Sequence, residues 1–242
     1  PPIAAEYARV APWVIKSADQ MRPPPPPDLK SELYARDYNE TKEMGGARST
    51  KRTAEQAAAV KFWTQLNFGP VWQEAARQLS AAKGLSLADN ARLFALLNMG
   101  TANTFIIDWD AKFTYNFWRP VTAIRNGDQD GNDATERDAG WMPFNATPMH
   151  PEYPSQAAII SGVSMGILEA VVGPNPSAPV VVSDLMDPKV QRRFANVKEM
   201  ADETKNVRIW GGIHFRNSLD VGDEMGRKIA VYLIENSIRP SN

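Results

Sequence analysis

The segment Lys112-Phe-Thr-Tyr-Asn-Phe-Trp-Arg119-Pro120 places two cationic side chains seven positions apart. Seven steps along an α-helix return a side chain to within about 20° of its starting direction, roughly 10 Å further along the axis. Lys112 and Arg119 are therefore expected to share one helical face, with Arg119 at the frayed helix end before the proline. Two cations on one face, with no carboxylate at helical pairing distance between them, indicate a binding site for a small anion.

A helix start supplies a second part of this site. The pair Pro154-Ser155 precedes a small and apolar run over 157–172, which predicts a buried helix with Ser155 near its N-terminus. Amide N–H groups in the first turn of a helix have no partner within it, and the helix dipole favours negative charge there. The Ser155 hydroxyl and the N–H groups of Gln156 and Ala157 are therefore expected to face the anion.

A third part lies further along the chain, where Arg208 and His214 are six positions apart. Six helical steps rotate a side chain by about 240°, so the two residues cannot share a helical face. The intervening Gly211-Gly212 predicts a loop, and a loop can turn both side chains to one point. Cations, a hydroxyl, amide donors and an imidazole together suit a tetrahedral oxyanion of the phosphate type.

The basic residues also have a simpler interpretation. Each could pair with a nearby carboxylate, and Asp108, Asp110 and Glu203 are available for such pairs. From the residues alone, local ion pairs and a shared anion site are both open.

Most of the remaining chain has helical periodicity. Gly84 is typical of a helix end, and Ser86 with Asp89 three residues later is typical of a helix start. The helix after Ser86 is apolar enough to be central and largely buried, and it is expected to run on into Lys112. The strand signals are weak, with one β-branched run over 180–182. We therefore predict an all-α fold, a helical bundle with long loops, with helices over 53–66, 70–82, 86–112, 157–172, 188–205 and from 217 or 218 to a point before Pro240.

The N-terminal part of the chain has little helical periodicity. Residues 23–27 are five consecutive prolines, which must adopt an extended polyproline II conformation. A spacer laid over the surface is favoured over a ligand for a partner's groove. We divide the chain into an extended, proline-rich segment over 1–52, packed on the domain, and a helical-bundle domain of catalytic type over 53–242.

Composition excludes several classes of function. The chain has 242 residues with 43% hydrophobic content, enough for one large core. Its formal net charge of −1 gives no electrostatic reason to expect nucleic acid as a partner, and no apolar run approaches the roughly 20 residues that span a bilayer. No cysteine is present, which excludes disulfides and thiolate metal sites. The acidic loop over 126–138 does not match EF-hand spacing, so a solvated turn is favoured over a calcium site.

The three segments together resemble the signature motifs of a known superfamily, which joins vanadium-dependent haloperoxidases with type-2 phosphatidic acid phosphatases and bacterial non-specific acid phosphatases. The first motif is Lys, six residues, Arg-Pro, the second is Pro-Ser-Gly-His, and the third is Arg, five residues, His. The corresponding positions in this chain are Lys112, Arg119 and Pro120, then Pro154-Ser155-Gln156-Ala157, then Arg208 and His214. The flanking residues over 117–124 and 150–155 are similar to the soluble bacterial haloperoxidase branch.

The resemblance implies a helical bundle with an anion pocket at its centre and assigns each motif residue a role. The oxygens of vanadate or phosphate would be neutralised by Lys112, Arg119 and Arg208. Ser155 would donate through its hydroxyl and Gln156 through its backbone N–H. In a haloperoxidase His214 would bond to vanadium, and hydrogen peroxide would bind there before halide is oxidised. In a phosphatase His214 would instead attack the phosphorus of a small phosphate ester.

The second motif departs from the family pattern. Gly-His is replaced by Gln156-Ala157, and alanine cannot carry out the proton transfer of an imidazole. The aspartate that commonly orients the third-motif histidine in the phosphatases is replaced by Ser218. His150 is expected either to enter the pocket and take over proton transfer or to be a loop residue bonded to backbone. Further candidate proton donors are Tyr115, Glu152 and Tyr153.

Three functions remain open on this resemblance. The first is a vanadate-dependent haloperoxidase that oxidises halide with hydrogen peroxide, weakened by the loss of the imidazole at Ala157. The second is a phosphatase acting on small phosphate esters, and the third is a degenerate homologue that binds vanadate or phosphate and catalyses little. The resemblance also allows a homo-oligomer, since family members are often dimers or larger, and a periplasmic or secreted location.

Overall fold

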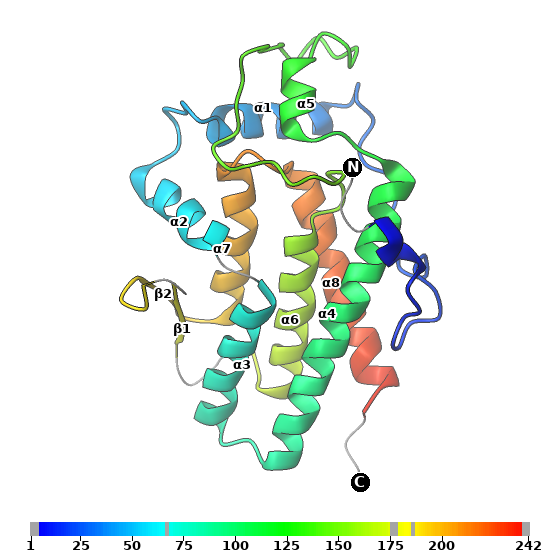
Figure 1. The fold of residues 1–242 in the computed structure, drawn as a ribbon, viewed down its shortest axis with the longest axis vertical. Coiled ribbons are helices and arrows are strands. Elements are labelled where there is room, and N and C mark those ends of the chain that lie inside the picture. The colour runs from blue at the N-terminus through cyan, green and yellow to red at the C-terminus, as the bar shows by residue number, and fades with distance from the viewer. Residues whose placement is uncertain (1–4, 66–67, 175–178, 185–186, 239–242) are drawn as a thin grey trace.

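Helix α4 (Leu87–Tyr115) is the long element beside which much of the bundle is arranged, as Figure 1 shows. The Ser86 side chain caps its start by accepting a hydrogen bond from the Asp89 N–H at 3.1 Å, as the sequence predicts. Gly84, just before it, has a φ of +70°, the left-handed conformation typical of a helix end. The helix extends past Lys112, which is fully buried near its end.

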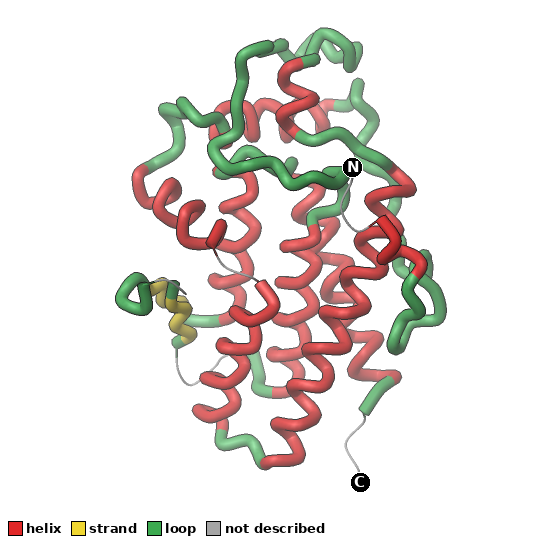
Figure 2. The backbone as a smooth tube through the Cα atoms, viewed as in Figure 1, coloured by secondary structure: helices red, strands yellow, loops and turns green. Residues whose placement is uncertain are grey.

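The computed structural model describes residues 5–65, 68–174, 179–184 and 187–238. Within these ranges the fold is an all-α helical bundle, as predicted, and Figure 2 shows how little of it is strand. The other elements are η1 (Ala5–Arg9), α1 (Glu32–Gly45), α2 (Ala54–Gln65), α3 (Phe68–Lys83), α5 (Pro120–Arg125), α6 (Gln156–Val171), β1 (Val180–Ser183), β2 (Gln191–Phe194), α7 (Val197–Trp210) and α8 (Arg216–Asn236).

Helix α6 is at the centre of the bundle and packs against α3, α4, α7 and α8. Its approach to α8 is close enough to require glycine. A Cβ built on Gly226 would lie 2.3 Å from the carbonyl oxygen of Ile159, a separation that no side chain could accept without a shift. This close packing fixes the N-terminal end of α6 beside the start of α8, where the second and third motifs lie.

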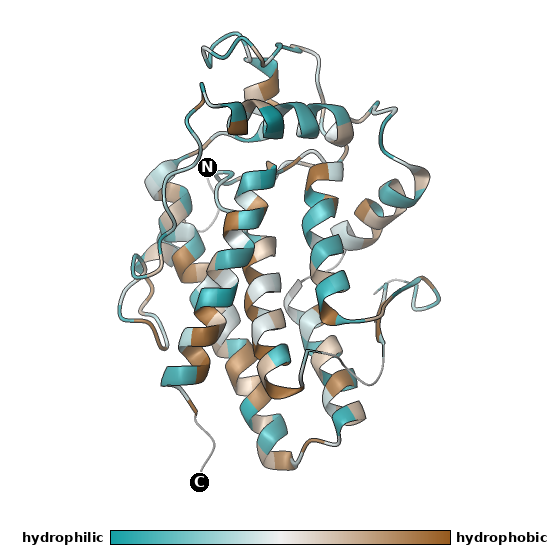
Figure 3. Ribbon diagram, turned by 180° about the vertical axis from the view of Figure 1, so that it is seen from behind, coloured by the Kyte–Doolittle hydropathy of each residue, from teal (hydrophilic) through white to brown (hydrophobic). Residues whose placement is uncertain are grey.

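The outer helices have mixed surfaces. Seen from behind, α7 and α8 carry both hydrophilic and hydrophobic residues (Figure 3). Their buried positions include Met200 and Val207 on α7 and Leu219, Ile229 and Leu233 on α8. This is the pattern of helices that cover a core on one face and contact water on the other. Among the described residues, no helix has the length and apolar character needed to cross a bilayer.

The structure corrects two local predictions. The expected helix over 188–205 begins only at Val197, because residues 191–194 form strand β2, which pairs antiparallel with β1. The segment over 1–52 is not extended throughout, since helix α1 lies within it and crosses one end of the bundle (Figure 1). The division into two segments stays a prediction, and Pro240, expected beyond the last helix, lies outside the described residues.

The proline run lies in extended conformation across the domain and is tied to it by side chains. Arg22 forms an ion pair of 2.7 Å with Asp110 on α4. The hydroxyl groups of Tyr115 and Tyr153 donate to the carbonyl oxygens of Pro23 and Pro24, the latter at 2.8 Å. The segment therefore supports the end of α4 and the loop that leads into α6.

Candidate functional site

The first two cations of the predicted site lie on different elements. Helix α4 ends at Tyr115, and Asn116 follows in a left-handed conformation with φ 46° and ψ 42°. Arg119 comes after this turn as the N-cap residue of α5. The expectation of one continuous helical face was therefore wrong, because the chain turns between the two residues. The turn nevertheless brings both side chains to the loop over 150–154.

Lys112 uses its ammonium group to hold that loop. The side chain is fully buried, and its Nζ donates to the carbonyl oxygens of Pro151 at 3.1 Å, Glu152 at 3.0 Å and Pro154. An ammonium has three N–H donors, so three carbonyl groups can take all of them. Burial lowers the pKa of Lys112 to about 8, while Asp108 at 3.6 Å opposes that shift. Lys112 thus shapes the pocket wall and contributes charge to it.

Arg119, in the first motif, contacts the third motif and the loop that precedes the second. Its Nε donates to the carbonyl oxygen of His150 at 2.9 Å, and its Nη1 donates to that of Ile213 at 2.8 Å. The same Nη1 lies 3.1 Å from Nε2 of His214. Only 6% of Arg119 is exposed, and burial lowers its pKa to about 10, so the guanidinium stays charged at neutral pH. These partners are all neutral groups, so its charge is not cancelled by them.

His214 is held by a carboxylate that the sequence analysis considered only as a proton donor. Its Nδ1 lies 2.7 Å from Oε1 of Glu152, which also accepts the N–H of Phe215 at 3.0 Å. An arginine N–H can only donate, so the contact with Arg119 requires a lone pair on Nε2 and the proton on Nδ1. Burial, reinforced by the charge of Arg119, lowers the pKa of His214 well below its ordinary value. The neutral imidazole therefore directs its unprotonated Nε2 toward Arg119.

Glu152 is fully buried in the loop that Lys112 holds. Burial raises its pKa to about 7, and the positive charge of Arg119 opposes that rise. Phosphatases of the resembled superfamily commonly place the orienting carboxylate four residues after the histidine, where this chain has Ser218. Here the carboxylate comes from the other side of the pocket, 62 positions earlier in the chain.

The start of α6 is arranged as the sequence predicts. Ser155 is the N-cap residue, and its own N–H donates to the carbonyl oxygen of Ser218 at 3.1 Å. Its hydroxyl is buried and has no hydrogen-bond partner within the described part of the chain. Ala157, in the first turn, is 9% exposed and supplies no polar side-chain group. A buried hydroxyl and first-turn amide groups form the donor set expected for an anion.

Arg208 reaches the site from the last turn of α7, followed by the predicted loop. Gly212 has a φ of +74°, and the Ile213 N–H returns to the carbonyl oxygen of Arg208 at 3.1 Å. A Cβ on Gly212 would lie 2.4 Å from the carbonyl oxygen of Gly45. Both the positive φ and this close approach therefore require glycine in the turn. Burial, followed by the like charge of Arg119, lowers the pKa of Arg208 to about 10.

The alternative of separate local ion pairs does not describe this cluster. Asp110 pairs with Arg22 at 2.7 Å, and Glu203 pairs with Arg192 at 2.5 Å. Of the three carboxylates considered, Asp108 alone faces a signature cation, at 3.6 Å from Lys112. Three buried cations thus gather around His214, as a shared anion site requires.

Comparison with known proteins agrees with this arrangement. A family model described as the VCPO second helical-bundle domain matches residues 92–240, which include all three motifs. The chain belongs to this family.

Relatives of the family share both sequence and fold with the chain. Vanadium chloroperoxidase of Curvularia inaequalis is 25% identical over 234 residues, an alignment that covers 72% of this chain and 38% of that protein. The crystal structure of a bacterial vanadium-dependent iodoperoxidase superposes with a TM-score of 0.83 at 25% identity, covering 100% of this chain and 59% of that one. A bacterial vanadium-dependent chloroperoxidase has a TM-score of 0.74 at 16% identity and 96% and 54% coverage, which shows the shared fold. The chain thus spans less than two thirds of the length of each.

As a member of the VCPO family, the chain can be tested for its fit to vanadate. The orphaned Ser155 hydroxyl, the first turn of α6 and the cluster of cations suit a tetrahedral oxyanion. The unprotonated Nε2 of His214, which contacts Arg119 at 3.1 Å, suits a bond to the central atom. The two carboxyl groups within the cluster, Asp108 and Glu152, both have pKa values raised by burial, to about 6 and about 7. Positive charge therefore exceeds negative charge, and the residues fit the group.

His150 lies beside Arg119 and also contacts the backbone. Its ring packs edge-on against Trp109, with centroids 4.6 Å apart, and its Nδ1 is 3.0 Å from Nη2 of Arg119 and 3.1 Å from the carbonyl oxygen of Pro151. It is thus both in the pocket and close to backbone. Burial lowers its pKa to about 3, so the imidazole is neutral near pH 7 and has no proton to release as an imidazolium. This disfavours His150 as a general acid.

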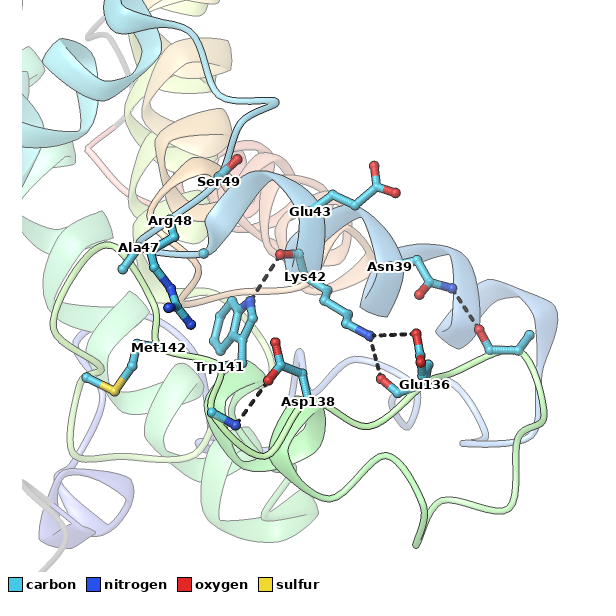
Figure 4. Close-up of a pocket in the computed structure, with 13 residues that line it drawn as sticks. Asn39, Lys42, Glu43, Ala47, Arg48, Ser49, Glu136, Asp138, Trp141 and Met142 are labelled. Atoms are coloured by element: carbon cyan, nitrogen blue, oxygen red, sulfur yellow. Dashed lines mark hydrogen bonds and ion pairs between the residues drawn. The ribbon is translucent and has the colours of Figure 1, made fainter.

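An open depression of about 800 Å³ leads from the surface to Arg119 and His150. Its wall is largely apolar and includes Phe117, Trp118 and Met149. A separate cavity of about 560 Å³, between α1 and the loop over 134–142, contains none of the signature residues (Figure 4). In Figure 4 Lys42 of this cavity contacts both the backbone carbonyl oxygen and the carboxylate of Glu136. The candidate site is thus the buried cluster beside the first depression, which includes Arg119 and His150.

Proposed function

We propose that the chain is a vanadate-dependent haloperoxidase, which oxidises halide with hydrogen peroxide. The observation that carries the proposal is the state of His214. Glu152 holds its Nδ1 at 2.7 Å, and its Nε2 faces a cluster of buried cations. Support comes from the family assignment and from relatives whose names specify vanadium-dependent iodide and chloride peroxidases.

The chain's residues would divide the work of holding vanadate. Arg119, Arg208 and Lys112 would neutralise its oxygens, and the Ser155 hydroxyl and the first-turn N–H groups of α6, including that of Gln156, would donate to them. His214 would bond to the vanadium through Nε2, and Arg119 would exchange its contact with the imidazole for one with an oxygen. When bound, vanadate supplies a Lewis-acidic centre that activates hydrogen peroxide toward halide.

Glu152 would keep the imidazole in the tautomer that leaves Nε2 free. A carboxylate that accepts the other ring N–H of a metal-bound histidine fixes the ring and raises its basicity. Lys112 would act in part through the loop, because its bonds to three carbonyl oxygens hold Glu152 in position. The same loop leads directly to Ser155, so one buried lysine organises two parts of the site.

Phosphate-ester hydrolysis is a second candidate, favoured by the same His214–Glu152 pair. A nucleophile whose base or orienting group lies within hydrogen-bond reach is the arrangement used in covalent catalysis. The leaving group would then have to depart without a proton from position 157, where alanine stands. Aryl phosphates, whose leaving groups are stable as anions, are therefore the substrates expected to react first.

The test is oxidation of iodide and bromide by vanadate-loaded protein with hydrogen peroxide, run beside His214→Ala. Halide oxidation that requires both vanadate and His214 is the expected result. No halide oxidation, in protein shown to have taken up vanadate, would overturn the proposal. Hydrolysis of p-nitrophenyl phosphate by the vanadate-free protein would then support the phosphatase, and its absence would leave a homologue that only binds the anion.

A further inference from the structure

A second polar cluster lies beside the anion site. Asp108 is on α4, one helical turn before Lys112, and is fully buried. It faces the first turn of α6, where Gln156 replaces the glycine of the family motif. The polar and charged groups directed at Asp108 are Lys112 from α4, Arg119 from the start of α5 and the Gln156 amide from α6. The next residue, Ala157, stands where relatives in the family pattern have histidine.

This cluster has unused hydrogen-bonding capacity. Neither carboxylate oxygen of Asp108 has a partner in normal hydrogen-bond geometry within the described residues, since Lys112 is 3.6 Å away. The Gln156 amide lowers the pKa of Asp108, yet its Nε2 also lacks a partner of normal geometry. The nearby Ser155 hydroxyl is in the same condition. Buried polar groups without partners are uncommon, and several in one place point to a ligand.

The mixture of donors and acceptors specifies the chemistry of that ligand. An anion suits Arg119 and Arg208 but would be repelled by the carboxylate of Asp108. A small neutral hydroxylic molecule can donate to a carboxylate oxygen and accept from an amide N–H at the same time. Hydrogen peroxide has this property, and the proposed reaction requires it next to the anion site.

We propose that Asp108 and Gln156 form a binding site for hydrogen peroxide that takes the place of the missing second-motif histidine. The inference rests on the proposed function. Gln156 donates its amide N–H to a peroxide oxygen, and Asp108 accepts the peroxide proton. In that step one O–H bond of the peroxide breaks and an O–H bond forms on the carboxylate. The hydroperoxide anion left behind is stabilised by the charges of Lys112 and Arg119, and no electrons are transferred.

The protonation behaviour of Asp108 is consistent with this role. Burial raises its pKa to about 6, and the charges of Lys112 and Arg119 oppose a larger rise. The carboxyl group is therefore ionised near pH 7 and is a stronger base than an exposed aspartate. A glycine at position 156 would have no side-chain amide to place beside Asp108. The replacement of Gly-His by Gln-Ala therefore adds a side-chain amide and removes an imidazole at the same turn.

Peroxide binding can be measured without turnover. Hydrogen peroxide is titrated into vanadate-loaded protein in the absence of halide and followed by ultraviolet absorbance. The affinity for vanadate itself is measured separately by calorimetry. The variants are Asp108→Asn and Gln156→Leu. The control is Asp110→Asn, the same change on the same helix at a residue that pairs with Arg22 and with none of the signature cations.

Asp108→Asn is expected to weaken peroxide binding about tenfold or more and Gln156→Leu about threefold to tenfold, because each removes one hydrogen-bonding group. Vanadate affinity should change less than threefold in both, and Asp110→Asn should match the wild type. Adding Ala157→His to Asp108→Asn should restore part of the peroxide affinity. Peroxide affinity equal to wild type in both variants would overturn the inference, and Gln156→Leu decides it alone if Asp108→Asn does not fold.

The outcomes separate this inference from the proposed function. Tight peroxide binding that depends on Asp108, without halide oxidation, would sustain the peroxide site and reject the haloperoxidase. Halide oxidation with peroxide binding unchanged in both variants would sustain the haloperoxidase and reject the peroxide site. A loss of vanadate affinity in Asp108→Asn that equals its loss of peroxide affinity would show a merely structural role and would also reject it.

Discussion

The site has two sides that differ in how closely they follow the family pattern. The anion cradle, formed by Lys112, Arg119, Ser155, Arg208 and His214, retains every motif residue. The proton-transfer side, formed by Asp108, Gln156 and Ala157, has lost the motif glycine and histidine. In the cradle, Lys112 and Arg119 each bind several backbone carbonyl groups. On the proton-transfer side, the carboxylate of Asp108 and the side-chain amide nitrogen of Gln156 have no partner of normal geometry among the described residues.

This difference indicates that binding and chemistry can diverge separately within one pocket. The cradle depends on charges placed by three distant segments, and the loop held by Lys112 connects them. Loss of the Lys112 or Arg119 side chain would leave buried carbonyl groups of the other segments without a donor, at a cost of about 1–3 kcal/mol for each group. On the proton-transfer side, both replaced motif residues, Gln156 and Ala157, lie in the first turn of α6, and the Gln156 amide faces Asp108 on α4.

Removing the central imidazole tests the cradle most severely. His214→Ala should lower halide oxidation by about a thousandfold or more, because one residue of a catalytic unit accounts for most of its effect. Vanadate affinity should fall with it, since the proposed bond to vanadium is lost. Turnover and vanadate affinity are both measured on protein whose fold is checked by circular dichroism. Retention of both would show that the cradle does not work through this histidine.

Replacing the orienting carboxylate tests whether the cradle extends to Glu152. Glu152→Gln keeps the shape but removes the charge that holds Nδ1 of His214. We expect a loss of about tenfold to a hundredfold in vanadate affinity or activity, the usual effect of removing such a partner. Glu224→Gln, which breaks an exposed ion pair with Lys228 on α8, is the matched control. Equal effects from the two changes would show that Glu152 does not orient His214.

Restoring the family motif tests the proton-transfer side. The double variant Gln156→Gly with Ala157→His should raise halide oxidation about tenfold to a hundredfold, within the range that general acid–base catalysis contributes. Vanadate affinity should stay near the wild-type value, because the cradle is unchanged. The measurement is the rate at saturating peroxide and halide. An unchanged rate would mean that the substitution at this position does not limit the reaction.

The smallest effect is expected from disturbing the packing of α6 against α8, which holds both sides of the site. Gly226→Ala places a Cβ within 2.3 Å of the Ile159 carbonyl oxygen and should lower the free energy of unfolding by about 1–3 kcal/mol. Gly140→Ala, where the closest atom is 3.7 Å away, should change it by less than about 0.5 kcal/mol. Thermal denaturation of the two variants compares them. Similar midpoints would show that α6 and α8 can separate without loss.

Some parts of this structure were predictable because they depend on local chemistry. The cap at Ser86, the helix end at Gly84 and the glycine turn before His214 each follow from one or two residues. The strand over 191–194 was not predictable, since Gln191 to Phe194 has neither strong strand propensity nor a clear alternation, and pairing with β1 decides it. Helix α1 was missed for a similar reason, since its mean hydropathy is low and its burial comes from packing against α5 and α7.

The candidate site shows the same division. The motif spacing identified the cradle residues, but the helical geometry inferred for Lys112 and Arg119 was wrong, because the left-handed turn at Asn116 intervenes. Glu152 was singled out only as one of several proton donors. Its partnership with His214 spans 62 positions, and no local pattern encodes such a contact. The order His150-Pro-Glu-Tyr-Pro-Ser155 was the available signal, since it placed a carboxylate three residues before the helix start.

By itself, the sequence determined the class of fold, the family resemblance and the set of cationic residues, because helical periodicity and motif spacing are written locally along the chain. Only the tertiary structure decided which partners those residues have. Lys112 holds carbonyl groups, Arg119 faces Nε2 of His214, and Asp108 meets Gln156. These contacts join α4, α6 and the loop before α8, and they exist because close packing of α6 against its neighbours excludes water and brings distant segments together.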